Sequence, residues 1–198
     1  MINEDLLLKF GAKKAKFKKG DLIFSEASPA INYYQISEGQ VKMTNYSEDG
    51  KEFTQGIFEN HQSFGEPPLL ADTHYPANAE ALCDTIIIQL HKSAFLDLLI
   101  AYPDIHLKLT KTLAKRLYYK AIMASEISNH DAEHRILRII DYLKYEVHHQ
   151  ESLYSFKVPL TRQQIADLTG LRVETVIRAI KNLQLKKLVL IKNRKVYR

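Results

Sequence analysis

The chain contains no tryptophan, a single cysteine and, before Arg116, no arginine at all. A lone cysteine, Cys83, excludes an internal disulfide and cannot by itself hold an iron–sulfur cluster, which needs several thiolates. One cysteine in 198 residues is typical of a reducing compartment, so we expect a cytoplasmic protein. The missing arginines deprive the first half of the chain of the side chain best suited to bind phosphate through two hydrogen bonds.

Long apolar runs are also missing. The longest apolar cluster, residues 85–90, is far too short to span a membrane. The apolar residues Leu6–Leu8 follow two acidic residues, Glu4 and Asp5, which is not the pattern of a signal peptide. We therefore expect no membrane partner.

Motifs for catalysis are absent as well. The chain has no phosphate-binding loop, nucleophile elbow or paired-carboxylate motif, and we expect no enzyme. His61, His74 and His91 lack the close H-x-H pair of metal-binding cupins, so no metal and no cofactor are expected. Haem ligation by Cys83 or a histidine stays open, although no local motif favours it. Cys83 itself is predicted to be a small, buried apolar side chain.

Positive charge is concentrated near the C-terminus. The whole chain carries a net charge of +5, and residues 155–198 contain eleven basic and two acidic residues, which leaves a net −4 for the rest. A basic segment on a slightly acidic body is typical of a nucleic-acid-binding face on one domain. Binding to phosphates through such a face is expected to weaken as salt is added.

The residues 161–183 predict two short helices joined by a tight turn. Thr161 and Gln164 have the spacing of a capping box, so a helix should begin just after Thr161. Gly170 stands where a left-handed residue is needed to end it. A second helix, from about Val173, has its apolar positions on one face: Val176, Ile180 and Leu183. This is a helix-turn-helix pattern, whose second helix normally lies in the major groove of DNA.

The opposite face of that second helix carries Arg172, Glu174, Thr175, Arg178 and Lys181. Arginine can bind guanine through two hydrogen bonds, and glutamate can accept one from cytosine. The alternative is a solvated helical face with an ion pair between Glu174 and Arg178, which are four residues apart. The capping box, the turn glycine and the basic surroundings favour DNA recognition.

Residues 17–90 predict short strands separated by turns, typical of an antiparallel barrel or sandwich. Pro103 then opens a long helical run to about Ser128, with apolar residues at steps of three or four. Such a helix is too long to be covered by the barrel alone, so a two-helix contact through a two-fold axis is expected. Its predicted interface residues are Leu109, Leu113, Leu117, Ala124 and Ile127. The alternative is a helix packed only on its own domain.

The remaining segments complete an α+β organisation. Asp131 is a predicted N-cap of a further helix. After the helix-turn-helix, residues 188–191 and 196–197 predict a two-stranded wing whose turn carries Lys192 and Arg194. We therefore expect three parts: a sensor β-roll over 1–102, a long dimerisation helix over 103–129, and a winged helix-turn-helix over 130–198.

This order of parts resembles the catabolite activator (Crp/Fnr) superfamily of bacterial transcription factors, over nearly the whole chain. Residues 33–39 (YYQISEG) are similar to the family's first sensor hairpin, 64–66 (FGE) to its ligand cassette, and 161–178 to its DNA-reading signature. The resemblance implies base contacts by Glu174 and Arg178 and phosphate contacts by Arg162 and Thr175. Arg172 is assigned with the base contacts, and Lys181, Lys192 and Arg194 with the phosphate contacts.

Two departures from the family pattern matter. At a position where relatives of the cyclic-AMP receptor usually have arginine, this chain has Val173, just after Arg172, which predicts an altered base preference. In cyclic-nucleotide binders Gly65 and Glu66 would hold the ribose, and an Arg-Ser pair ten residues later the phosphate. Here that place reads YPANA from Tyr75, so Gly65, Glu66, Pro76 and Ala77 line a candidate effector pocket without its cation.

The sequence thus predicts a homodimeric regulator that binds double-stranded DNA at a pseudo-palindromic operator. Its β-roll would sense an unknown small-molecule effector other than cyclic AMP, and RNA polymerase is a further candidate partner. The alternative is a ligand-sensing or protein-interaction β-roll with weak or vestigial DNA binding.

Overall fold

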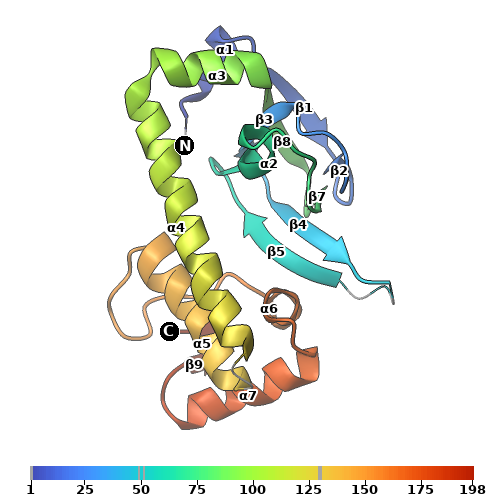
Figure 1. Ribbon diagram of the computed structural model, residues 1–198. Helices are drawn as coiled ribbons and strands as arrows, with labels where there is room; N and C mark the ends of the chain where they lie inside the picture. The colour runs from blue at the N-terminus through green and yellow to red at the C-terminus, as the bar shows by residue number, and fades with distance from the viewer. Residues whose placement is uncertain (1, 49, 51, 129–130) are drawn as a thin grey trace. The chain divides into compact units, whose positions relative to one another are not determined.

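The computed structural model describes residues 2–48, 50, 52–128 and 131–198, and its elements are labelled in Figure 1. The chain divides into two compact units, Met1–Ala114 and Lys115–Arg198. Helix α4 (Pro103–Ser128) begins in the first unit and ends in the second. The three-part organisation, with α4 as a segment of its own, stays a prediction. Within the described residues, no helix is both long and apolar enough to cross a membrane.

The first unit is built on two four-stranded antiparallel sheets. One has the strand order β1-β8-β3-β6 and the other β2-β7-β4-β5, which confirms the predicted antiparallel architecture. The bounds are β1 (Lys13–Phe17), β2 (Leu22–Phe24), β3 (Asn32–Glu38), β4 (Val41–Tyr46), β5 (Glu52–Phe58), β6 (Ser63–Phe64), β7 (Asn78–Ala81) and β8 (Thr85–His91). Three helices of this unit are α1 (Glu4–Lys9), α2 (Glu66–Leu70) and α3 (Lys92–Ala101).

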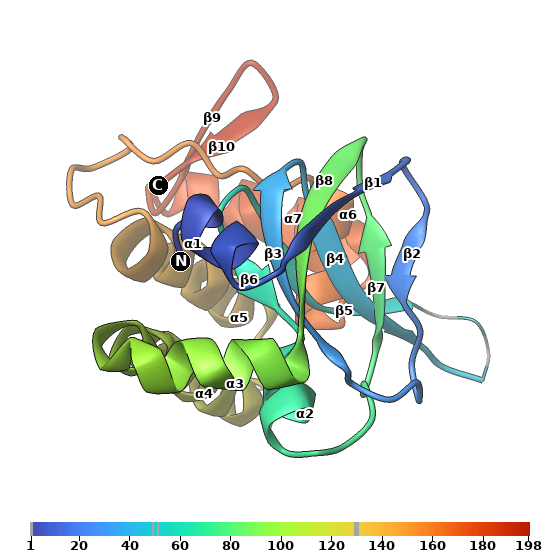
Figure 2. The ribbon, with the colours of Figure 1, turned by 90° about the horizontal axis from the view of Figure 1, so that it is seen from above.

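Strand β8 organises the first sheet. It pairs with β1 over five residues on one side and with β3 on the other, as Figure 2 shows. Ile87 and Leu90 of β8 are buried, and Phe95 and Leu98 of α3 join them in the core. Strand β1 is an edge strand, and its exposed lysines discourage pairing with another chain.

Helix α4 has one face in the core of the first unit. Leu109 is buried there, and Ile105 and Leu113 pack against the same core. Leu109 and Leu113 were predicted to lie in a dimer interface. The burial of Leu109 within one chain corrects that assignment for Leu109, whereas Leu113 is half-buried against the same core. Leu117 is 70% exposed, and Ala124 is exposed too. Ile127 lies in α4, but its side chain lies outside the described part of the structure.

The second unit contains the end of α4 and the DNA-binding candidate. Its further elements are α5 (Ala132–Asp141), a π-helix η1 (Tyr142–Val147), α6 (Arg162–Thr169), α7 (Val173–Leu185), β9 (Leu190–Lys192) and β10 (Lys195–Tyr197). Asp131 caps α5 as predicted, because its side chain accepts a hydrogen bond from the Glu133 amide. Tyr119 of α4 stacks on Tyr142 with ring centroids 3.8 Å apart.

A single apolar core joins the helices of this unit to the wing. Ile136 and Ile140 of α5 meet Ile165 of α6 and Ile180 of α7, and Val196 of β10 belongs to the same cluster. Polar contacts reinforce the packing.

One of these contacts ties the wing to α5. The Arg198 side chain binds both carboxylate oxygens of Asp141, at 2.6 and 3.2 Å, and donates to the Leu188 carbonyl at 2.7 Å. The wing is thereby held at its base as well as by its apolar side chains.

Candidate nucleic-acid interface

Helix α6 is set by the capping box that the sequence predicts. The Thr161 hydroxyl accepts from the Gln164 amide at 3.1 Å, and the Gln164 side chain accepts from the Thr161 amide at 2.8 Å. Two amides that would otherwise lack a partner at the helix start are thus satisfied. Gly170 ends the helix with φ 68°, the left-handed conformation that glycine adopts without steric cost. Both predictions are confirmed.

Buried residues of α6 and a hydrogen bond from α5 hold the turn between α6 and α7. Ala166 is buried, and its small side chain lets the helices approach closely. Thr169 is buried as well, with its hydroxyl donating to the Ile165 carbonyl at 2.6 Å, so a polar residue takes part in the buried face. From α5, Arg135 donates to the Thr169 carbonyl at 2.9 Å. Leu168 of α6 is half-buried.

Helix α7 presents its polar face to solvent. Its buried residues are Val176, Ala179, Ile180 and Leu183. The residues predicted to contact bases, Arg172, Glu174 and Arg178, are all exposed. Among the described contacts, Glu174 and Arg178 make no ion pair with each other, so the alternative of an internal salt bridge finds no support. Both polar ends are therefore available to a partner.

The predicted phosphate contacts divide between the two helices and the wing. On α7, Lys181 is exposed, whereas Thr175 is half-buried. Arg162, at the start of α6, is half-buried, and burial lowers the pKa of its guanidinium from the usual value. Lys192 and Arg194 are exposed on the wing.

The wing is a tight hairpin with a basic tip. Lys192 and Lys195 lie directly opposite each other, and the two-residue turn between them has positive φ at Asn193 (48°) and Arg194 (61°). Positive φ at both central residues is the mark of a type I′ turn, which matches the twist of the strands. Figure 2 shows the hairpin as a narrow projection.

A third segment, which the sequence analysis missed, steadies the wing. Lys157 forms an isolated antiparallel β-bridge with Tyr197, and the Val158 amide donates a hydrogen bond to the Val196 carbonyl at 2.9 Å. The segment that precedes α6 thus pairs with β10 through an isolated bridge beside the two-stranded wing. Its alternating apolar residues, Phe156 and Val158, were the available signal.

The candidate effector cassette lies in the first unit. Gly65 has φ 77° and precedes α2, and the following Glu66 is buried and hydrogen-bonded to the Ser63 hydroxyl. Ala77 is fully buried, whereas Pro76 is exposed and its carbonyl accepts from the Asn45 amide group at 2.6 Å. Three of the four cassette residues, Gly65, Glu66 and Ala77, are therefore buried, and Pro76 lies at the surface.

Aromatic rings adjoin this cassette, and the sequence analysis did not single them out as a group. The Phe24 and Tyr75 rings stack with centroids 3.6 Å apart and an interplanar angle of 12°. Tyr34 and Phe64 lie within 6 Å of Phe24, at 5.5 and 5.9 Å between centroids. The available signal was the position of Tyr75 next to Pro76.

Two observations concern the cysteine and possible metal ligands. Cys83 is exposed, so its prediction as a buried apolar side chain is wrong; it lies in the connection between β7 and β8. Within the described ranges, no cluster of three histidine, cysteine or acidic side chains is arranged to hold a metal ion.

The chain matches two known domain families. Residues 14–102 match the cyclic nucleotide-binding domain, and residues 134–197 match the Crp-like helix-turn-helix domain. The transcriptional activator protein Anr of Pseudomonas protegens is 23% identical over 181 residues, which cover 91% of this chain and 74% of that protein. A CRP-like cAMP-activated global transcriptional regulator of Mycobacterium tuberculosis is 25% identical over 165 residues, covering 83% of this chain and 74% of that protein.

The fold is also found among solved structures. The c-di-GMP-responsive global regulator CLP of Xanthomonas campestris superposes with a TM-score of 0.75, at 20% identity over 98% of both chains. At that identity the likeness concerns the fold.

Proposed function

We propose, from the premise that this chain belongs to the Crp/Fnr family of DNA-binding transcription regulators with an effector-sensing domain, that it acts as a homodimer on a pseudo-palindromic operator. Members of this family are transcription regulators and not enzymes. The observation that carries the proposal is the exposed face of α7 with Arg172, Glu174 and Arg178, which make no ion pair with one another among the described contacts. The helix-turn-helix that carries this face is capped by Thr161 and packs on an apolar core.

Glu174 and Arg178 are the base-reading pair in this proposal. They lie one turn apart on the exposed face of α7, and Arg172 stands at the N-cap of the same helix. Side chains near the N-terminus of a recognition helix are those that reach base edges in the major groove. A charged pair whose members are engaged with each other would have to break before reading bases, and this pair is not so engaged.

The wing and the helix ends supply phosphate contacts. Lys192 faces Lys195 across the hairpin, and like charges in that position destabilise a strand pair. A polyanion relieves this repulsion, which is why we assign Lys192 and Arg194 to the DNA backbone. Lys181, Arg162 and Thr175 are assigned to phosphates too, because phosphate contacts fix the register and orientation of a protein on the duplex.

The dimer contact is assigned to an exposed stripe on α4. Its members share one face at steps of three and four residues, as in the seam of a coiled coil: Leu107, Thr110, Ala114, Leu117, Ala121 and Ala124. The opposite face is occupied by the core of the first unit through Leu109. The stripe therefore has no covering within the described chain, and a second copy of α4 would bury it.

Selection of bound duplexes from a random DNA pool tests the proposal. We expect enrichment of an inverted repeat whose halves lie about one helical turn apart, roughly 34 Å between centres. The same selection with Arg178→Ala protein serves as the control, and should lose one base position of each half. A pool without any enriched motif, together with strongly salt-dependent binding, would favour the alternative of an interaction module with vestigial DNA binding.

A further inference from the structure

We infer that the stacked rings of Phe24 and Tyr75 fill the effector cassette beside Gly65 from within the chain, so that the β-roll binds no cyclic nucleotide and DNA binding does not depend on one. This inference rests on the proposed DNA-binding function and concerns its regulation.

The rings close the roll by joining its two sheets. Phe24 belongs to β2 in one sheet, whereas Tyr34 and Phe64 belong to β3 and β6 in the other. The Tyr34 and Phe64 rings stack at 5.6 Å, and both lie against Phe24. All of these rings and Tyr75 are buried, with 7% or less of each residue exposed. The interior at this end of the roll is therefore occupied by side chains.

Gly65 shows that the ring pair lies directly on the cassette. A Cβ atom at this position would be 3.2 Å from Phe24 Cε1 and 3.2 Å from Tyr75 Cε1, closer than a side chain normally packs. The residue also has φ 77°, which strains any other amino acid. The glycine thus serves the close approach of two of the protein's own rings, and the space over its backbone is already taken.

An anionic ligand would also find the wrong electrostatics here. Burial raises the pKa of the Tyr75 hydroxyl, and the electrostatic interaction and the hydrogen bond with Tyr34 raise it further. This interior therefore opposes a negative charge. The carboxylate of Glu66 is already bonded to Ser63. A cyclic phosphate needs a cation or several amide donors, and the chain has no arginine before Arg116.

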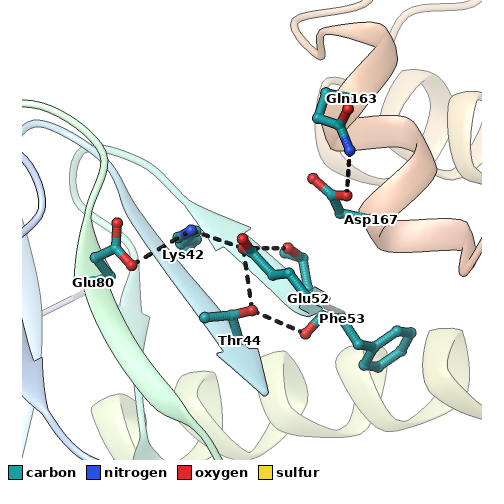
Figure 3. A network of polar contacts seen from close by, with 8 residues as sticks. Lys42, Thr44, Glu52, Phe53, Glu80, Gln163 and Asp167 are labelled. Carbon is teal, nitrogen blue, oxygen red and sulfur yellow. Dashed lines mark hydrogen bonds and ion pairs between the residues drawn. The ribbon is translucent and has the colours of Figure 1, made fainter. Parts of the chain in front are cut away.

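Lys42 does not replace the missing arginine. It lies on the central strand β4 with its side chain 14% exposed, between Glu52 at 2.7 Å and Glu80 at 3.4 Å, as Figure 3 shows. Burial works to lower its pKa, but the hydrogen bond to Glu52 and the charges of both carboxylates outweigh it, and the pKa is raised. This cation is already neutralised by two partners.

The first test is a titration of the 198-residue protein with cyclic AMP and with cyclic GMP, followed by calorimetry and by the affinity for the selected operator. We expect no binding heat, and an operator Kd that changes less than twofold at saturating nucleotide. Stoichiometric nucleotide binding, or a tenfold change in the operator Kd, would overturn the inference. If no operator is found, the proposed function fails, whereas the calorimetry still decides whether the cassette is closed.

The second test is a double-mutant cycle on thermal stability. Gly65→Ala should lower Tm more in the wild-type background than in Phe24→Ala protein, where one of the two rings at 3.2 Å is gone. Phe95→Ala is the matched control. It removes another buried, stacked ring of the same unit, 4.4 Å from Tyr33, which the structure does not bring against Gly65. Additive losses in both backgrounds would show that the ring pair does not occupy the cassette.

Discussion

At the scale of single residues, a substitution of Arg178 distinguishes base recognition from phosphate binding. Arg178→Ala should weaken binding to the selected operator by about 1–3 kcal/mol and relax the preference at one base position, because a two-point contact to guanine is lost. Titration of duplexes that each differ at one position of the half-site measures this. Lys181→Ala, three residues along the same exposed face, is the control. It should weaken all duplexes alike and reduce the salt slope by about 1. If Arg178→Ala also weakens all duplexes alike, Arg178 binds phosphate.

Arg194 strains the wing hairpin but supplies a positive charge at its tip. Its φ of 61° is costly for a residue with a Cβ atom, and glycine is the favoured second residue of a type I′ turn. Arg194→Gly should therefore stabilise the second unit by about 1 kcal/mol and weaken DNA binding at low salt. Thermal unfolding and operator titration on one preparation measure both effects. The control is Asn193→Gly, which relieves the same strain and keeps the charge, so DNA binding should be unchanged. Equal DNA affinity of Arg194→Gly and wild type would remove Arg194 from the interface.

The residues that the sequence predicted well are those whose role is local. The capping box of Thr161 and Gln164 and the left-handed Gly170 act over three or four residues, so their spacing along the chain is sufficient. The Phe24–Tyr75 stack joins residues that are far apart in sequence, and no local pattern announces it. Cys83 was wrongly placed for the same reason, because the exposure of a single residue in a turn depends on tertiary context.

At the scale of elements, strands β1 and β7 show where pattern reading stops. The residues of β1, KKAKF, look like a basic lead-in, and those of β7, NAEA, contain no β-branched residue. Each becomes a strand because a neighbour supplies the ladder: β8 pairs with all of β1, and β7 lies between β2 and β4. Strand propensity is dominated by such packing. Strands β3, β4, β5 and β8, which are rich in apolar or aromatic residues, lie within the range 17–90 for which the sequence predicts short strands, except that β8 ends at His91.

Helix α4 was predicted as one long helix, but its apolar residues form two stripes that spacing alone does not separate. Ile105, Leu109 and Leu113 pack on the core of the first unit. The exposed stripe begins at Leu107 and includes Leu117. A helix with apolar residues on two faces has two surfaces to cover, and only the structure tells which one its own chain covers.

Leu117→Glu tests the second stripe. Leu117 is 70% exposed in the single chain, so the substitution should leave the fold stable while it places a charge in the predicted seam. We expect a monomer at concentrations where wild type is a dimer, measured by analytical ultracentrifugation. Lys115→Glu introduces the same side chain at an exposed position outside the stripe and should stay dimeric. A dimeric Leu117→Glu protein with unchanged affinity would place the interface elsewhere.

At the scale of the whole molecule, the uneven charge predicts how binding responds to salt. Residues 155–198 carry a net +9, and the remainder is acidic overall. Cations that meet phosphates release counterions, so the logarithm of the affinity falls linearly with the logarithm of the salt concentration. A dimer brings two basic faces to one duplex. Its salt slope should therefore be about twice that of Leu117→Glu protein on a single half-site.

The same reasoning predicts a dependence on half-site spacing. Inserting about five base pairs between the halves of the selected operator turns one half to the opposite side of the helix, since a turn has about 10 base pairs. A dimer joined through α4 cannot then seat both recognition helices, and the affinity should fall to that for a single half-site. Leu117→Glu protein already binds halves independently, so the insertion should not change its affinity. Gel-shift titrations of both proteins on both duplexes measure the four constants. If the wild-type affinity tolerates the insertion, the two reading heads are not held by a common helix contact, and the dimeric mechanism is wrong even if Glu174 and Arg178 read bases.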